Sequence, residues 1–355
     1  MPVARKRNNI IAFAKLRLIY AMGISHRRKL LLLYLTGTMA FGGFLGWLVV
    51  KNIFWSELIG VFLEANFGLV LTSLILVLGA SWLRAFRWSI LLSDDQTTST
   101  RLLLVEQTGT ALDSFSPVRV LDEVIEIGLL VLRYKIPLAQ VLATMALQRT
   151  FEFLVTISVL GIGVLTIDSL EPFALLVAVG VGFGICSLFL LFSIGPVLAN
   201  MPMLRDITIV QQFGSAVLFL RQSRRRSLYA FMLTILQAGM IAMAGWIIGV
   251  SIGLRLPLIE AAVVTIAILF FSSTVPGLPM AIGTFEWFAM QILILLGASP
   301  HHAIAFSVIL HIVVFGPPIL IALFFLSKEG LLSSRKILAL GQESKEIISL
   351  GSSNQ

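Results

Sequence analysis

Several charged side chains interrupt stretches of sequence that are otherwise apolar enough to cross a membrane. Arg84 and Arg87 are three residues apart near the end of one stretch, and Arg149 and Glu152 have the same spacing within another. Residues three apart share a face of a helix, so each pair presents its polar groups together. The planar guanidinium group of arginine binds two phosphate oxygens at once. These residues therefore favour recognition of an anionic, phosphate-bearing group.

A further charged residue, Glu286, follows a run that a continuous helix would not tolerate. Pro276, Pro279 and Gly283 precede it, and the apolar stretches on both sides contain no other formal charge. Proline removes an amide donor and glycine frees the backbone, so we expect the helix to break over residues 276–286. A broken helix beside a buried acid is typical of a substrate or ion site in a transporter.

Structural interpretations exist for the same residues. Arg84 and Arg87 can extend to anionic lipid at the cytoplasmic edge of the membrane, because arginine pairs often end a span. Arg149 and Glu152 can form an internal ion pair that holds helices together. The acid after the break can cap the following helix, pair with an arginine of another helix, or relay a proton with His311. A lone histidine among apolar residues is more often packed and hydrogen-bonded.

The segment 101–135 is too charged to cross a membrane and too apolar to be a solvated loop. Pro117 lies near its middle, so we expect two short helices that dip into the membrane and return to the same side. Its charged residues include Arg119, Asp122, Glu123 and Glu126. Three neighbouring carboxylates can form a catalytic or divalent-metal cluster, since hard cations take oxygen ligands. A solvated or salt-bridged helix face explains them with fewer assumptions.

Composition places the chain among integral membrane proteins. Of its 355 residues 58% are hydrophobic and 12% are charged, whereas about a quarter are charged in soluble domains. About 20 apolar residues cross a bilayer, which predicts an all-α protein with about eight transmembrane helices in addition to the re-entrant and broken segments. The predicted spans are 30–50, 65–92, 137–167, 172–198, 227–254, 260–275, 287–296 with the broken segment before it, and 301–326.

The basic residues set the expected topology. Segment 1–29 contains eight Lys and Arg residues, which predicts a cytoplasmic N-terminus, a membrane domain over 30–327 and a short cytoplasmic tail over 328–355. Arginines between residues 205 and 226 predict an interfacial helix on the same side. The net charge of +8 therefore favours anionic lipid over nucleic acid as the partner. The single cysteine, Cys186, excludes a disulfide framework, and no metal or cofactor motif is present.

Four motifs resemble those of a known family. They are Arg84-Ala-Phe-Arg87-Trp88, Ser116-Pro-Val-Arg119 through Asp122-Glu123, Arg149-Thr-Phe-Glu152, and Pro276-x-x-Pro279-x-x-x-Gly283-Thr-Phe-Glu286 with Leu310-His311 after it. In these motifs the chain resembles the flippase-like transmembrane family, the membrane half of lysylphosphatidylglycerol synthase, over roughly residues 30–326. It departs from the family pattern at Leu121, Ile125 and Met280-Ala281, where the family has Gly, Arg and Gly-Gly.

The resemblance implies a multi-pass protein of a prokaryotic plasma membrane that moves an anionic or glycosylated lipid. The residues expected to line the path are Arg84, Arg87, Arg119, Arg149, Glu152 and Glu286. The family's soluble aminoacyl-transferase domain has no counterpart in the sequence, so we do not expect an enzyme. Two alternatives stay open: a membrane-embedded glycosyltransferase acting on lipid-linked sugars, and a non-catalytic partner of a lipid-synthesis enzyme. A homodimer is also compatible with the sequence, which identifies neither the lipid nor any coupling ion.

Overall fold

The computed structural model describes residues 32–51, 53–92, 97–116, 121–200, 208–275 and 277–328. Over these ranges the chain is helical and contains no strand, which confirms the predicted all-α class. A first helix, Leu32–Val50, precedes the labelled helices. In chain order these are α2 (Trp55–Glu64), α3 (Phe67–Leu92), α4 (Ser99–Ser114), α5 (Leu121–Gly128), η1 (Leu129–Arg133), α6 (Leu138–Thr166), η2 (Asp168–Phe173), α7 (Ala174–Asn200), α8 (Thr208–Gln222), α9 (Arg224–Ser251), α10 (Leu258–Thr274), η4 (Pro279–Ala281), α11 (Thr284–Leu295) and α12 (Pro300–Lys328).

Eight apolar segments of the described chain coincide with the eight predicted spans. Six are long enough to cross a membrane alone: Leu32–Val50, α3, α6, Asp168–Ile194, α9 and α12. Two are shorter, namely Leu258–Thr274 and Pro279–Leu295. At 1.5 Å per residue, the 17 residues of α10 extend about 26 Å, slightly less than the hydrocarbon core of about 30 Å. The chain is therefore an integral, multi-pass membrane protein.

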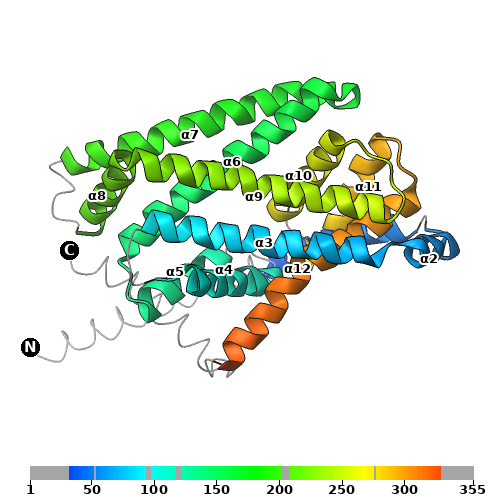
Figure 1. Ribbon diagram of the computed structural model, residues 1–355, viewed down its shortest axis with the longest axis horizontal. Coiled ribbons are helices and arrows are strands. Elements are labelled where there is room, and N and C mark those ends of the chain that lie inside the picture. The colour runs from blue at the N-terminus through cyan, green and yellow to red at the C-terminus, as the bar shows by residue number, and fades with distance from the viewer. Residues whose placement is uncertain are drawn as a thin grey trace, which may run out of the picture.

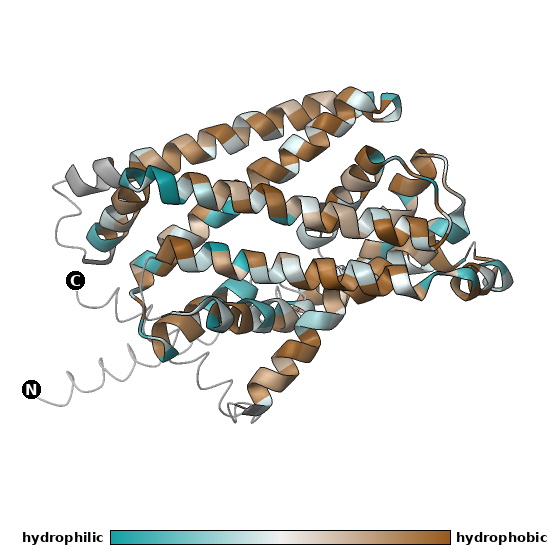
Figure 2. Cartoon of the chain, viewed as in Figure 1, coloured by the Kyte–Doolittle hydropathy of each residue, from teal (hydrophilic) through white to brown (hydrophobic). Residues whose placement is uncertain are grey.

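The long helices lie side by side, and their outer faces are apolar. In Figure 1, α3 and α9 run next to each other, while α6 and α7 lie along one side of them. α2 and α11 lie toward one end of the bundle and α8 lies at the other (Figure 1). Figure 2 shows that α7 is predominantly hydrophobic along its length, and its Leu175 is 78% exposed. Such a surface suits lipid rather than water.

The predicted pair of short helices is present between α3 and α6. α4 and α5 contact each other, and α4 also contacts α3 and α12. Pro117 and Arg119, which lie in the connection, are outside the described residues. The depth of this pair in the membrane stays a prediction. Two of its carboxyl groups nevertheless lie inside the protein, since Glu106 of α4 and Glu126 of α5 are 1% and 2% exposed.

The predicted helix break is also present, because α10 ends at Thr274 and α11 begins at Thr284. Pro276 lies outside the described residues. Pro279 begins a 3-10 turn, and Gly283 has a φ of +82°, a conformation that favours glycine. The space also requires glycine: a Cβ at Gly283 would lie 2.4 Å from the carbonyl oxygen of Gly42. The break is thus packed directly against the backbone of the first helix.

Candidate arginine–carboxylate site

Arg87 joins three helices at the centre of the protein. Its side chain is fully buried, and its Nη1 donates a hydrogen bond to Thr234 Oγ1 of α9 at 2.8 Å. Its Nη2 donates to Gln148 Oε1 and Glu152 Oε1 of α6, at 3.0 Å and 2.5 Å. A cation with this many enclosed partners is held in place, so Arg87 links α3 to α6 and α9 rather than extending to the membrane surface.

Arg84, one turn earlier on α3, is less enclosed. Its Nε lies 3.5 Å from Glu106 Oε1 and 3.5 Å from Glu152 Oε1. The side chain is 22% exposed, and its Nε has no hydrogen-bond partner. Burial raises the pKa of Glu106 to about 7, against the opposing effect of the Arg84 charge. Arg84 therefore has weaker ties to its surroundings than Arg87.

Arg149 is the most exposed arginine of the cluster. Its Nη2 donates to Asp122 Oδ2 at 2.8 Å and to Glu123 Oε1 at 2.9 Å, both on α5. Its Nη1 donates to Glu152 Oε2 at 3.4 Å. The side chain is nevertheless 40% exposed. The internal Arg149–Glu152 pair is present. Two of the three α5 carboxylates, Asp122 and Glu123, form salt bridges with Arg149.

The carboxyl groups of α4 and α5 allow the charge of the cluster to change near neutral pH. Burial, with a hydrogen bond to Asp122, raises the pKa of Glu123 to about 7. Burial also raises the pKa of Glu126 well above its usual value. When pH falls through 7, Glu106 and Glu123 take up protons, and the cluster becomes more positive. Within the described residues no group of three or more potential ligands is arranged to hold a metal ion.

A cavity of about 410 Å³ opens beside these arginines. Its polar part is lined by Arg84, Arg149, Glu152, Thr234 and Gln237, and the buried Gln237 Oε1 has no hydrogen-bond partner. Its remaining lining is largely apolar and comes from α6, α9 and α10: Phe153, Val155, Thr156, Ala238, Ile241, Ile266, Leu269, Phe270 and Ser273. One cavity thus offers cationic groups and an apolar wall, the two surfaces that an anionic amphiphile requires.

The cavity lies well inside the membrane domain. Glu152 is near the middle of α6, which has 29 residues and a length of about 43 Å. An ionised group at this depth is costly unless it is paired or faces a wet cavity. Both conditions are met here, because Glu152 contacts three arginines and also lines the cavity.

Glu286 lies elsewhere, at the helix break. Its Oε2 accepts a hydrogen bond from the backbone N–H of Gly283 at 2.7 Å, which caps α11. Its Oε1 lies 2.7 Å from His311 Nδ1 of α12. The His311 ring packs between Phe285 and Phe315, with both centroids at 4.7 Å, and its Nε2 has no hydrogen-bond partner. Glu286 therefore combines the cap with a histidine partner and is not among the residues lining the arginine cavity.

Sequence reasoning did not single out several partners of the arginines. Gln148 and Glu106 bind Arg87 and Arg84, and Thr234 and Gln237 line the cavity from α9. Thr234 and Gln237 could have been found in the sequence, because they are two polar residues three positions apart within an otherwise apolar span. Of the six predicted path residues the structure groups four, Arg84, Arg87, Arg149 and Glu152. It sets Glu286 apart, and Arg119 is outside the described chain.

The comparisons with known proteins agree with the resemblance seen in the motifs. A family model described as "Lysylphosphatidylglycerol synthase TM region" matches residues 31–322. The match covers most of the chain, which therefore belongs to this family. No curated protein and no solved structure matches the chain.

Proposed function

We propose that this member of the lysylphosphatidylglycerol synthase transmembrane family moves an anionic or glycosylated lipid across a prokaryotic plasma membrane. The observation that carries the proposal is the cavity between α3, α6, α9 and α10. Its arginines suit a phosphate, and its apolar wall suits an acyl chain. The family is named for the membrane region of a lipid synthase, and this supports lipid as the substrate class.

In this proposal one arginine of the cluster holds the helices in position, and the other two bind the lipid headgroup. Arg87 is enclosed and holds the helices in position, whereas Arg84 and Arg149 face the cavity. A headgroup that leaves water must receive substitutes for its hydrogen bonds, and two guanidinium groups can provide them to one phosphate. Glu152 keeps both cations near the same point of the cavity, since it contacts each of them.

Two carboxylates of α5 hold Arg149 by salt bridges. Asp122 and Glu123 neutralise Arg149 when no lipid is bound, which avoids an unpaired cation within the membrane. An arriving phosphate competes with them for the same nitrogen. Binding of substrate is thereby coupled to release of α5, and this exchange is a route by which the site opens toward one side of the membrane.

The Glu286–His311 pair is the candidate for coupling to protons. This role rests on the contact between a carboxyl and an imidazole group, whose atoms lie 2.7 Å apart at the helix break. The break is where α11 meets the first helix, so a change in its hydrogen bonds affects the packing of two apolar segments. Lipid movement then requires no covalent chemistry by the protein.

The test is lipid exchange in liposomes that contain the purified protein. Fluorescent phosphatidylglycerol, a glycolipid and phosphatidylcholine are each placed in both leaflets, and a membrane-impermeant quencher reports how much becomes accessible from outside. We expect protein-dependent exchange that favours one headgroup, with a loss of tenfold or more in Arg149→Gln. Arg225→Gln is the matched control, because Arg225 is exposed and lies outside the cavity. Absence of exchange for every headgroup in folded protein, with and without a proton gradient, contradicts the proposal.

A further inference from the structure

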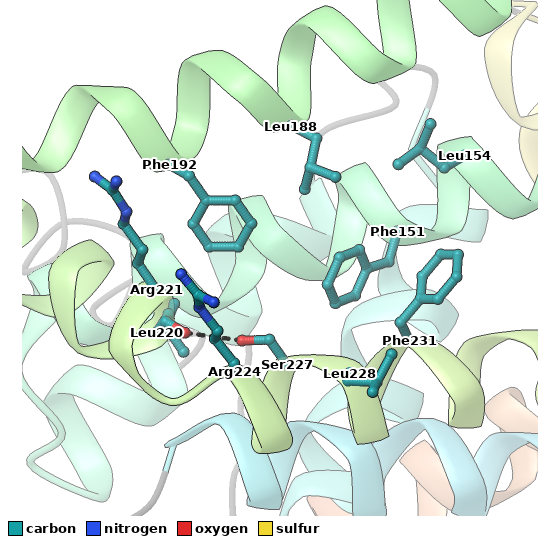
Figure 3. Close-up of a pocket in the computed structure, with 10 residues that line it drawn as sticks. All are labelled: Phe151, Leu154, Leu188, Phe192, Leu220, Arg221, Arg224, Ser227, Leu228 and Phe231. Atoms are coloured by element: carbon teal, nitrogen blue, oxygen red, sulfur yellow. Dashed lines mark hydrogen bonds between the residues drawn. The ribbon is translucent and has the colours of Figure 1, made fainter.

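A second cavity, separate from the arginine site, lies where α6, α7, α8 and α9 meet. It has a volume of about 390 Å³, within the usual size range of ligand pockets. Figure 3 shows its lining: Phe151, Leu154, Leu188, Phe192, Leu220, Arg221, Arg224, Ser227, Leu228 and Phe231. Apart from two arginines and one serine, these side chains are apolar. We call this cavity the α8 groove.

The polar groups of the α8 groove gather at one end. In Figure 3 the side chains of Arg221 and Arg224 lie close to Phe192, whereas Leu154 and Phe231 lie at the opposite end. The hydroxyl hydrogen of Ser227 is not available to a phosphate, because it is donated to the carbonyl oxygen of Leu220 at 2.9 Å. The two guanidinium groups are therefore the polar groups that the groove offers to a ligand.

The arginines at this end have no anionic partner among the described side chains. Arg221 and Arg224 are exposed and take part in none of the ion pairs of the described chain. Arg225 and Arg226 follow directly, so four cations lie within six residues. This density of unpaired positive charge at a membrane edge attracts anionic headgroups.

The cationic residues of the groove lie near the expected membrane surface, and the apolar residues along α7 and α9 lie deeper. This order matches the headgroup and the acyl chain of a lipid. Arg224 begins α9, at the end expected to face the cytoplasm, and Phe231 is seven residues farther along, about 10 Å deeper. On α7, which runs the opposite way, Phe192 lies beside the arginines and Leu188 lies deeper (Figure 3). Cations therefore stand at the interface level and apolar side chains stand at the acyl-chain level.

We propose that the α8 groove binds one anionic glycerophospholipid of the inner leaflet, with its phosphate on Arg221 and Arg224 and an acyl chain between α7 and α9. This site is distinct from the arginine cavity, and the inference does not depend on lipid translocation. Phe151 and Phe231 close its deep end as an edge-to-face pair with centroids 5.2 Å apart. Thr234, one turn beyond Phe231, already lines the arginine cavity.

A bound lipid would join α8 to the rest of the domain. α8 contacts α6, α7 and α9, and the groove is formed by these same elements. An acyl chain in the groove fills space between α7 and α9, and a phosphate neutralises the arginines of α8 and α9 together. We therefore expect the lipid to stabilise the protein as well as to bind it.

The test measures binding of phosphatidylglycerol and phosphatidylcholine to the purified full chain in detergent, by native mass spectrometry. We expect the wild type to prefer phosphatidylglycerol by about 30-fold, which corresponds to about 1 kcal/mol for each of two arginines. Arg221→Gln/Arg224→Gln should abolish this preference. Arg225→Gln/Arg226→Gln removes the same charge outside the groove and should retain it.

A further variant, Leu188→Trp, tests whether the lipid binds within the groove or is only attracted by the positive charge of the surface. Leu188→Trp leaves every charge in place but fills the groove, so it should lower binding of phosphatidylglycerol about tenfold. The inference is overturned if the wild type binds both lipids equally, if the two double variants lose the preference to the same extent, or if the tryptophan variant binds like the wild type. Thermal unfolding of each variant without added lipid shows that the changes act on binding rather than on folding.

Discussion

Substitution of Arg87 tests whether this arginine has a structural role while Arg84 and Arg149 bind the lipid. Replacement of Arg87 by methionine removes the cation but leaves a long apolar side chain in its place. Three partners lose a hydrogen bond: Thr234, Gln148 and Glu152. We expect this variant to be destabilised far more than Arg149→Met, although both lose one arginine of the same cluster.

The size of the effect follows from burial. Removing one partner of a buried ion pair costs about 3–5 kcal/mol, because the other charge stays behind without compensation. Glu152 keeps Arg84 at 3.5 Å and Arg149 at 3.4 Å, so the loss for Arg87→Met should be near the lower limit, about 3 kcal/mol. Arg149 is 40% exposed, and its replacement should cost about 1 kcal/mol or less.

The assay is thermal unfolding in one detergent of the wild type, Arg87→Met, Arg149→Met, Glu152→Gln and the double variant Arg87→Met/Glu152→Gln. Since the double variant removes the carboxylate as well, it should be more stable than the sum of the two single losses predicts. The reasoning is refuted if Arg87→Met unfolds within about 1 kcal/mol of the wild type, or if the two single losses simply add in the double variant.

Three further predictions concern other parts of the protein. Gly283→Ala should prevent stable packing of the helix break, because its Cβ would lie 2.4 Å from the Gly42 carbonyl oxygen; detergent-extracted protein should aggregate in size-exclusion chromatography. Burial raises the pKa of Glu106 from 4.5 to about 7, so wild-type stability should fall as pH rises from about 4.5 to about 7 and level off above that. Glu106→Gln should weaken that dependence, to which Glu123 also contributes, and gain up to about 3 kcal/mol at pH 8 in thermal unfolding. Glu286→Gln keeps the length of the side chain beside His311 and should lower lipid exchange more than tenfold while the protein remains folded.

Each of these predictions has a matched control. Gly297 also has a positive φ but open space around its Cβ position, so Gly297→Ala should cost only about 1 kcal/mol, and equal losses at both glycines would contradict the packing argument. A Glu106→Gln protein with an unchanged pH profile would exclude Glu106 as the titrating group. Normal lipid exchange in Glu286→Gln would reduce Glu286 to a helix cap.

The elements of the fold were predictable because their signals are local. Within the described residues, apolar length identified the helices that are candidates to cross the membrane. The two prolines and Gly283 identified the break before α11. Hydropathy could not show that the first helix packs against this break through Gly42. That contact joins residues far apart in the sequence, and a glycine within a span has several possible reasons to be there.

The roles of the charged residues were harder to predict. Arg84 and Arg87 share a spacing typical of a common face, yet one faces the cavity and the other is enclosed. Their environments differ because α9 packs along α3 and brings Thr234 to the second arginine. The rotation of a helix against its neighbours depends on tertiary packing. For the same reason the sequence left several partners open for Glu286, and the structure brings it to His311.

Whether a lipid occupies the arginine cavity is the central question, and photocrosslinking in membranes answers it most directly. A benzophenone amino acid at Ile241, on the apolar wall, should crosslink to phosphatidylglycerol, and the product should disappear when Arg149→Gln is added. The same probe at the outward-facing Leu175 should crosslink to lipid in both backgrounds. If the Ile241 probe captures no lipid while the Leu175 probe does, or if Arg149→Gln leaves its product unchanged, the cavity is not a lipid site and the account is wrong.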